Sequence, residues 1–586
     1  MGLSPFVPTV KESFVSQRVL GGLTAAGAIL VSWAVVSLPG SSVAQQSGAA
    51  VSPRWSTYLG FGEDEEFGGL TRSDAGEVFV VGTLPAFVPD AGTPVLRFKG
   101  RTERATVLVA AFHEDGGLSR WSAFGGDGDD RAVDIELGRD GKLYVAGRST
   151  SQDFSPIPFS SGENDSWSGS DNGFIAQLEP TTLLPNWLFL LGGSSVDRIQ
   201  DLAVGPDGNL YVTGITRSLP FPKERNAPVS DVISTDFEAF VARLSPGAGG
   251  GILDWSSVMR GANDDYGLAI SVGGGGQVYV TGSSDSADLF SPVSPVLGPT
   301  GGFDAFVVSL EPTDGGITKA TYLGGSDIDE GRALVLKSGG DPNFFVAGTT
   351  RSAGFPRDAG TSPQGADAFV VALRRDTFEL TGWRLLGGPD DDFGLSLALD
   401  TSAAATGKSL VYLGGSSKSR DAGFPLKDAF DTDFGAGEWE GFVAHVEVAA
   451  GVPVLWSSWV GGSGNDGVTA LWSDEQGRLL LGGATSSPDL VPSGMPGFDR
   501  THNGPPRDGG NDMYLMLVGQ PDAGQPDAGT PVTENPDAGV KPEVPEVKAL
   551  LGWSCGASAT GGAPLLLALG ALAGLALRAS RREPRA

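Results

Sequence analysis

The stretch Trp456-Ser-Ser-Trp-Val-Gly-Gly462 is one copy of the phrase that decides the fold of this chain. An acidic cluster and then a predicted hairpin follow it, and the whole unit recurs with a period of about 66 residues. A fixed period of one supersecondary unit is typical of repeat proteins, in which each unit buries its apolar face against its neighbours. Related phrases begin at Trp55, Trp121, Trp187, Trp255, Lys319, Trp383 and Trp456.

Each copy contains four runs with the composition of β-strands. The second run ends in glycine, as in Val78–Gly82, and a third run follows after a loop, as in Asp304–Leu310. Seven units of four antiparallel strands predict an all-β fold, a seven-bladed β-propeller spanning residues 55–518. The hairpins of first and second strands are expected at residues 66–82, 131–147, 198–214, 267–282, 331–348, 394–414 and 467–483.

The last copy lacks a fourth strand. It ends with the run Asp512–Leu517, and no further strand-like segment follows within the repeat. The missing strand is present at the other end of the array, as Trp55–Leu59. We expect this N-terminal strand to pair with Asp512–Leu517 and close the ring, which removes an unpaired sheet edge. The tryptophan that recurs at the fourth strand is interpreted mainly as packing between blades.

Composition narrows the range of functions. The net charge of -30 should repel nucleic acid and other polyanions. A single cysteine, Cys555, excludes an intrachain disulfide. The three histidines, His113, His445 and His502, lie in different repeats, whereas a histidine-based metal or catalytic site needs several converging side chains. No G-x-S-x-G, Walker or H-E-x-x-H motif is present, so a non-catalytic role is favoured over an enzyme.

The N-terminal segment has the features of a signal peptide. An apolar stretch, Val19–Leu38, follows Lys11 and Arg18, and small residues surround a site after Ala44. We therefore predict a signal peptide at residues 1–44, cleaved after Ala44, with a short lead-in at 45–54. The alternative is an uncleaved N-terminal membrane anchor.

The composition changes abruptly after the last repeat. Residues 519–548 repeat the phrase Pro-Asp-Ala-Gly, which cannot form a core and predicts an extended, disordered stalk. Residues 549–586 then contain Cys555-Gly556, the apolar run Ala563–Leu577 and an arginine-rich end. This segment is expected to be an anchor or sorting tail with a membrane-spanning helix, although fifteen apolar residues are short for a span of ~17–25.

Two resemblances to known families add to this interpretation. The phrases Trp55–Gly60 and Gly208–Gly214, and the recurrent Phe-Pro of Phe221-Pro222 and Phe355-Pro356, resemble the bacterial SBBP β-propeller repeat. The order of Cys555-Gly556, apolar run and arginines resembles the MYXO-CTERM sorting tail of myxobacterial surface proteins. The first resemblance implies a secreted or surface propeller without catalytic residues to transfer. The second implies processing near Cys555 and retention at the cell surface.

The loops that enter each first strand are acidic. If they form a ring around the axial channel, they are candidates for a cation site, with Ca²⁺ as the possible cofactor. The alternative is that these Asp residues form turns by bonding their own backbone, and no loop matches the EF-hand calcium pattern. The candidate metal ligands are Asp127, Asp129, Asp264, Asp327, Asp329 and Asp391.

These observations predict a monomeric propeller, exported and anchored to the cell envelope through its C-terminal tail. We expect it to be a binding or structural module in adhesion or surface contact, with an unknown extracellular protein or glycan as its ligand. The alternative is an extracellular polysaccharide lyase or hydrolase that uses the channel face, because paired carboxylates are abundant.

Overall fold

The computed structural model describes residues 51–519 except for loop segments, of which 86–103, 161–170, 226–235 and 500–509 are the longest. All described residues belong to one compact unit, Ala49–Ala586. The predictions of a signal peptide ending at Ala44, of a stalk after Gly519 and of a tail around Cys555 lie outside the described residues. Within the described part of the chain, no helix is long and apolar enough to cross a membrane.

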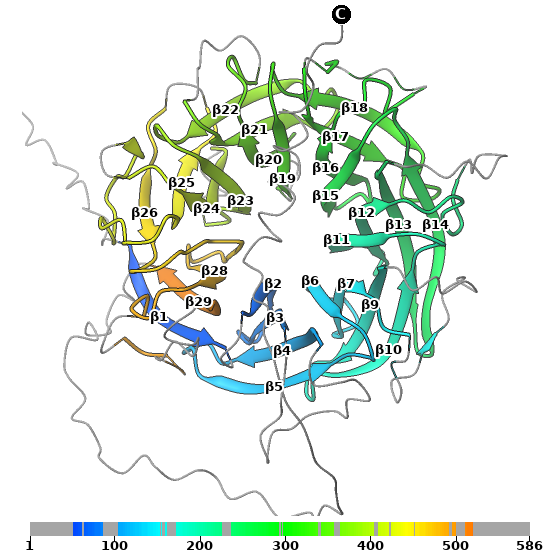
Figure 1. The fold of residues 1–586 in the computed structure, drawn as a ribbon, viewed down its shortest axis with the longest axis horizontal. Coiled ribbons are helices and arrows are strands. Elements are labelled where there is room, and N and C mark those ends of the chain that lie inside the picture. Colours follow the sequence, from blue (N-terminus) through cyan, green and yellow to red (C-terminus); the bar gives the residue numbers. More distant parts are fainter. Residues whose placement is uncertain are drawn as a thin grey trace, which may run out of the picture. The chain divides into compact units, whose positions relative to one another are not determined.

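The described strands form seven antiparallel sheets arranged in a ring (Figure 1), which confirms the predicted propeller. Blade 1 consists of β2 (Glu66–Arg72), β3 (Val78–Leu84), β4 (Thr106–Phe112) and β5 (Leu118–Phe124). Blade 2 consists of β6 (Asp130–Leu137), β7 (Leu143–Ser149), β9 (Asn172–Glu179) and β10 (Leu184–Leu191), with the short β8 (Phe159–Ser160) added at its edge. Blade 3 consists of β11 (Asp197–Val204), β12 (Leu210–Thr216), β13 (Glu238–Gly247) and β14 (Gly250–Met259).

The remaining blades follow the same order. Blade 4 consists of β15 (Asp265–Val272), β16 (Val278–Ser284), β17 (Asp304–Leu310) and β18 (Ile317–Leu323). Blade 5 consists of β19 (Asp329–Leu336), β20 (Asn343–Thr350), β21 (Asp367–Arg374) and β22 (Leu380–Leu386). Blade 6 consists of β23 (Asp392–Leu399), β24 (Leu410–Ser417), β25 (Glu440–Glu447) and β26 (Trp456–Val460). Blade 7 consists of β27 (Ala470–Ser473), β28 (Leu479–Thr485), β29 (Asp512–Gly519) and β1 (Ser52–Leu59).

The N-terminal strand closes the ring as the sequence predicts. Strand β1 is antiparallel to β29, with Trp55 opposite Leu517 and Leu59 opposite Met513. Blade 7 is therefore assembled from the two ends of the repeat array. Strand β27 is shorter than the predicted first strand of this blade, and Asp466 adds only an isolated bridge to Thr485.

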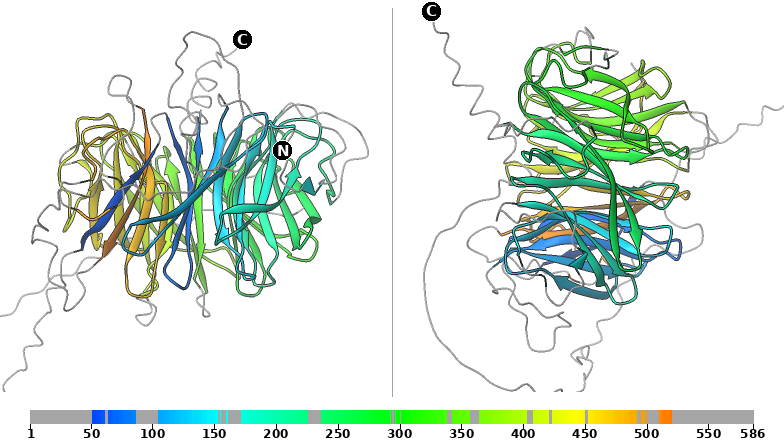
Figure 2. Two further views of the ribbon diagram at one scale, coloured as in Figure 1. Left: turned by 90° about the horizontal axis from the view of Figure 1, so that it is seen from below. Right: turned by 90° about the vertical axis from the view of Figure 1, so that its right-hand side faces the viewer.

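The first strand of each blade lies nearest the ring centre (Figure 1), and neighbouring first strands contact each other. In the side views the strands run roughly along the ring axis, so that their loops gather at two faces (Figure 2). The buried apolar residues of the described chain form seven clusters, each of which joins two neighbouring blades. Each blade is thus stabilised chiefly by its neighbours, as expected for a repeat protein.

The glycine that ends the apolar run of the second strand is required by a close approach of backbone. A Cβ atom on Gly147 would overlap the carbonyl oxygen of Arg131 and lie 2.7 Å from the ring of Phe174. The first strand has a register shift at this level, between Ala132 and Asp134. Any side chain here would separate the first and second strands, which explains why glycine recurs at this point of the repeat.

Three of the fourth-strand tryptophans form a hydrogen bond to the next blade. Trp55, Trp187 and Trp255 donate Nε1–H to the carbonyl oxygens of Glu114, Gly247 and Pro312, at 2.9, 3.0 and 3.0 Å. Each acceptor lies in the turn between the third and fourth strands of the following blade. Lys319, which departs from the tryptophan pattern, makes the same connection, because its Nζ donates to the carbonyl oxygen of Asp376.

Candidate functional site

One face of the ring is defined by a chain of backbone hydrogen bonds. The backbone N–H at the start of each first strand donates a hydrogen bond to a backbone carbonyl oxygen of the preceding blade. This acceptor belongs to the residue just before the third strand of that blade. Examples are Asp130 to Ala105 at 2.9 Å and Asp265 to Phe237 at 2.7 Å. The loops that enter the first strands and the ends of the loops between second and third strands therefore meet on this face, which we call the acidic face.

Six blades begin their first strand with a buried aspartate. These residues are Asp130, Asp197, Asp265, Asp329, Asp392 and Asp466. Asp197 shows the shared geometry: it accepts hydrogen bonds from Thr216 Oγ1 at 2.5 Å, Ser218 Oγ at 2.7 Å and the N–H of Gly193 at 2.7 Å. The two hydroxyls come from the end of the second strand of the same blade. The buried carboxylate thus ties the entry loop to the following hairpin.

The sequence carries a signal for this arrangement that the sequence analysis missed. Where the second strand ends, the chain reads Gly-x-Ser/Thr-x-Ser in blades 2 to 7, as in Gly147–Ser151 and Gly483–Ser487. In blade 3 the two hydroxyl residues, Thr216 and Ser218, follow Asp197 by 19 and 21 positions. Blade 1 departs from the pattern, with Glu65 in place of the aspartate and Leu84 in place of the first hydroxyl residue.

Burial raises the pKa values of these aspartates. Desolvation is the largest cause at each, and the hydrogen bonds from hydroxyls and backbone oppose it. The pKa is raised to about 6 at Asp130 and Asp197, to about 7 at Asp329 and to about 8 at Asp265. The nearby carboxylate of Glu238 adds to the shift at Asp265.

The structure places three of the six predicted metal ligands one position before a buried aspartate. The Oδ1 atoms of Asp129, Asp264 and Asp391 accept hydrogen bonds from the N–H groups of Ala105, Phe237 and Ala366, at 3.2, 2.9 and 3.0 Å. These donors belong to the preceding blade, so the three carboxylates connect neighbouring blades. Asp127 accepts from the N–H of Gln152 at 2.7 Å, and Asp327 from that of Ile328 at 2.9 Å.

The predicted ligands are not brought together. Asp327 and the buried Asp329 lie at the entry of blade 5, Asp127 and Asp129 lie in the entry loop of blade 2, and Asp264 and Asp391 lie in those of blades 4 and 6. Within the described residues, no group of three or more His, Cys, Asp or Glu side chains is placed to hold a metal ion. Binding of Ca²⁺ by these loops stays a prediction.

A second set of carboxylates lines the innermost strands of blades 2 and 3. Asp134 and Glu136 lie on β6, two positions apart on one side of the strand, and the buried Ile135 lies between them. Asp134 is hydrogen-bonded to Asp201 of β11. Asp201 in turn accepts from the N–H of Ile270 at 2.7 Å. Burial raises the pKa of all three carboxyls, and their mutual repulsion adds to the shift at Glu136 and Asp201.

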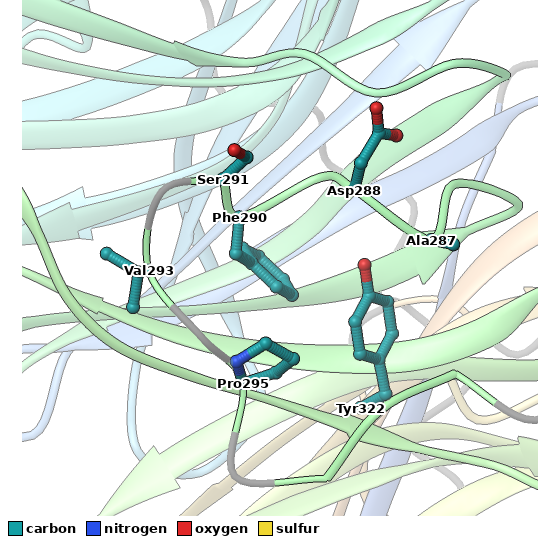
Figure 3. A pocket seen from close by; sticks show the side chains of 7 residues that line it. All are labelled: Ala287, Asp288, Phe290, Ser291, Val293, Pro295 and Tyr322. Atoms are coloured by element: carbon teal, nitrogen blue, oxygen red, sulfur yellow. The ribbon is translucent and has the colours of Figure 1, made fainter.

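A cavity of about 190 Å³ lies beneath the loop between the second and third strands of blade 4 (Figure 3). The ring of Phe290 lies 5.1 Å from that of Tyr322, and the phenol of Tyr322 donates to the carbonyl oxygen of Ser286 at 2.7 Å. Ligand pockets usually measure ~300–1,000 Å³, so this cavity is small for an organic ligand. It is lined by Ala287, Asp288, Phe290, Ser291, Val293, Pro295 and Tyr322.

No family model matches the sequence, and no curated protein matches it either. The resemblances to the SBBP repeat and to the MYXO-CTERM tail therefore stay predictions.

Among solved structures, the Dos1 propeller is 9% identical with a TM-score of 0.37, over 80% of this chain and 96% of that chain. The quinohemoprotein alcohol dehydrogenase ADHIIG from Pseudomonas putida HK5 is 10% identical with a TM-score of 0.37, over 81% and 77%. The β-propeller domain of the Trilobed protease from Pyrococcus furiosus is 8% identical with a TM-score of 0.33, over 72% and 91%. These distant similarities assign no function. The chain is a seven-bladed β-propeller protein by its own sheet topology.

Proposed function

We propose that this protein is an exported, surface-anchored β-propeller that acts as a non-catalytic binding or structural module. The observation that supports this proposal best is the uniform use of acidic residues on the acidic face. Six buried aspartates hold their own hairpins, and Asp129, Asp264 and Asp391 bond to neighbouring blades. These carboxylates stabilise a rigid scaffold, which leaves the connecting loops free to differ between blades.

The loops between second and third strands are the proposed binding elements. They emerge on the acidic face and differ in length, from residues 351–366 in blade 5 to residues 486–511 in blade 7. Variable loops on a rigid scaffold are the usual location of binding residues. The net charge of -30 favours a neutral or cationic extracellular protein or a neutral glycan over a polyanion. Export and anchoring rest on the terminal segments, and we propose that the protein acts as a monomer in contact with other surfaces.

One observation favours an enzyme as the second candidate. Asp134, Glu136 and Asp201 gather on the innermost strands with raised pKa values, and such carboxyls can donate and accept protons near neutral pH. An extracellular polysaccharide lyase or hydrolase that admits a chain into the channel would use these groups. Against it, Asp201 accepts a hydrogen bond from the N–H of Ile270, which already gives this side chain a role between blades.

A binding screen and an activity screen on the same purified protein separate these candidates. The protein is applied to an array of glycans and surface proteins and is incubated with generic polysaccharide substrates. The binding proposal predicts ligand capture without turnover, unchanged by Asp134→Asn. Turnover of a polysaccharide that Asp134→Asn abolishes, and that the exposed-site control Ile252→Ala retains, would establish the enzyme instead.

A further inference from the structure

The buried aspartates face a second set of side chains across the blade interfaces. The third strand of each blade begins at the acidic face, beside the first strand of the next blade. Five of the seven third strands begin with an acid, and the other two begin with a neutral residue. In chain order these first residues are Thr106, Asn172, Glu238, Asp304, Asp367, Glu440 and Asp512.

The pair at the interface of blades 6 and 7 is defined best. Glu440 is 0% exposed and Asp466 is 4% exposed. A Cβ atom placed on Gly461 would overlap Oε1 of Glu440 and lie 2.7 Å from Oδ2 of Asp466, so the two carboxyl oxygens face each other across this glycine. Oε2 of Glu440 accepts from the N–H of Gly435 at 2.8 Å, whereas Oε1 is buried and has no hydrogen-bond partner.

The interface of blades 5 and 6 repeats this arrangement. A Cβ atom on Gly387 would overlap Oδ1 of Asp367 and lie 3.0 Å from Oδ2 of Asp392. Oδ1 of Asp367 is buried and has no hydrogen-bond partner. Oδ1 of Asp392 is likewise buried without a hydrogen-bond partner, so at this interface the unpartnered oxygens come from both strands.

The charged surroundings of the Glu440–Asp466 pair are acidic, whereas Arg351 forms an ion pair at 3.0 Å with Asp391, the neighbour of Asp392. Among the described residues, no Lys, Arg or His forms an ion pair with any of these four carboxyls. Asp466 is instead surrounded by the hydroxyls of Thr485 and Ser487, and the charged groups nearest to Glu440 and Asp466 are further carboxylates, those of Asp431 and Asp489. The phenol of Tyr514 is also buried beside them. Asp391 faces Asp392. Two adjacent carboxylates cannot both stay ionised in such a site without a large cost.

We propose that Glu440 and Asp466 hold one proton between their carboxyls, and that this shared proton makes the contact between blades 6 and 7 sensitive to pH. The unpartnered Oε1 of Glu440 is then the protonated oxygen, and it donates toward Oδ2 of Asp466. Loss of the shared proton leaves two negative charges at this interface, which repel across Gly461 and weaken the contact between the two blades.

The pKa shifts of these groups have the direction that a shared proton requires. Burial and the neighbouring carboxylate of Asp466 raise the pKa of Glu440 to about 9, and burial raises the pKa of Asp466. A group whose pKa is higher in the folded than in the unfolded chain stabilises the fold fully only below its unfolded pKa. Its contribution is lost as the pH rises through the folded value, between about 4.5 and about 9 for Glu440.

A neutral side chain already occupies the same position in another blade. At the interface of blades 2 and 3, a Cβ atom on Gly192 would lie 2.6 Å from Oδ2 of Asp197 and 2.7 Å from the amide oxygen position of Asn172. The amide of Asn172 has nearly the shape of a protonated carboxyl group. This interface is therefore the natural counterpart of a pair that permanently holds its proton, and it supplies a matched control.

The test measures the thermal midpoint of the full-length protein at about pH 5.5 and about pH 8.5 in a buffer free of divalent ions. Glu440→Gln should raise the midpoint at the higher pH and raise it much less at the lower pH, which lies near the pKa of the unfolded glutamate. Asn172→Asp should lower the midpoint at the higher pH and change it much less at the lower pH, because it creates a new acid pair with Asp197. At about pH 7, unfolding of the wild type should release about one more proton than unfolding of Glu440→Gln.

Equal shifts at both pH values for both variants would overturn the proposal and leave Glu440 and Asp466 as hydrogen-bonding groups that do not share a proton. A wild-type midpoint at the higher pH that Ca²⁺ raises, with no such response in Glu440→Gln, would also overturn it, because a cation would then occupy the place of the proton. If Glu440→Gln fails to fold, Asn172→Asp decides alone, since it tests the same geometry at an independent interface.

Discussion

Trp55 offers the most direct test of how the ring is closed. This residue lies on β1, is 3% exposed, and donates Nε1–H to the carbonyl oxygen of Glu114 in blade 1 at 2.9 Å. Its ring lies so close to Gly116 that a Cβ atom on that glycine would come within 2.6 Å of it. The glycine has a φ of +83°, a conformation that also favours glycine. Trp55 therefore joins the last blade to the first.

Replacement of Trp55 by alanine removes the ring and leaves the carbonyl of Glu114 without its donor. A buried tryptophan truncated to alanine costs about 3–5 kcal/mol. Trp55→Phe keeps most of the apolar contact and loses the hydrogen bond alone, for about 1–2 kcal/mol. The control is Ile252→Ala, because Ile252 is 61% exposed and substitutions at such sites change stability by about 0.5 kcal/mol or less.

Denaturant unfolding followed by tryptophan fluorescence and by far-ultraviolet circular dichroism measures these differences. The expected order of stability is Ile252→Ala, equal to wild type, then Trp55→Phe, then Trp55→Ala. The reasoning is refuted if Trp55→Ala unfolds at the same denaturant concentration as Ile252→Ala, because β1 would then contribute nothing to closure.

Four further predictions concern the seam, the buried aspartates, the loops and the tail. A protein that begins at Gly60 should melt lower than one that begins at Gln45 and should aggregate through the exposed edge of β29; equal melting would contradict the pairing of β1. Because burial raises the pKa of Asp197 from 3.8 to about 6, its contribution to stability falls as the pH rises from about 4 to 6. Asp197→Asn should therefore flatten the stability profile in that interval, by roughly 2–3 kcal/mol at most, and an unchanged profile would show that this carboxyl does not titrate there. If the loops around Asp129 and Asp264 bind a cation, millimolar Ca²⁺ should raise the melting temperature more than Mg²⁺ at matched ionic strength, whereas equal shifts would indicate screening alone. Cys555→Ala should change processing or release from the cell surface while the propeller stays folded, and equal surface retention by fractionation would favour a plain anchor.

The strands were predictable because their signals are local and repeated seven times. Alternating apolar runs, a terminal glycine and a fourth-strand tryptophan recur at one phase, so that errors in single blades, such as the short β27, do not change the topology. The closing strand followed from the missing fourth strand of the last copy. Even the departure at Lys319 is compatible with the pattern, because its long side chain reaches the same turn as the tryptophans do.

The roles of the acidic residues were less predictable. Runs such as Asp129-Asp130 and Asp391-Asp392 show that a carboxylate is needed, but not which one is buried, because successive side chains of a strand point to opposite faces. The sequence analysis therefore named Asp129 and Asp391 and missed Asp130 and Asp392. The two hydroxyl residues at the end of the second strand could have identified which aspartate of each run is buried. The facing acids of the third strands gave no sequence signal, since they become neighbours only when two blades pack.

The position of β29 has a mechanical consequence. It is flanked on both sides, by β28 and by β1, and its last residue, Gly519, lies opposite Ser52. A pull on the chain beyond Gly519, directed along the strand, loads both ladders in shear, so that their hydrogen bonds must rupture together. A strand peeled sideways from a sheet edge would lose them one at a time. A propeller tethered through this end therefore receives tension at a strand that two neighbours hold, and the segment that completes the circle also resists the load.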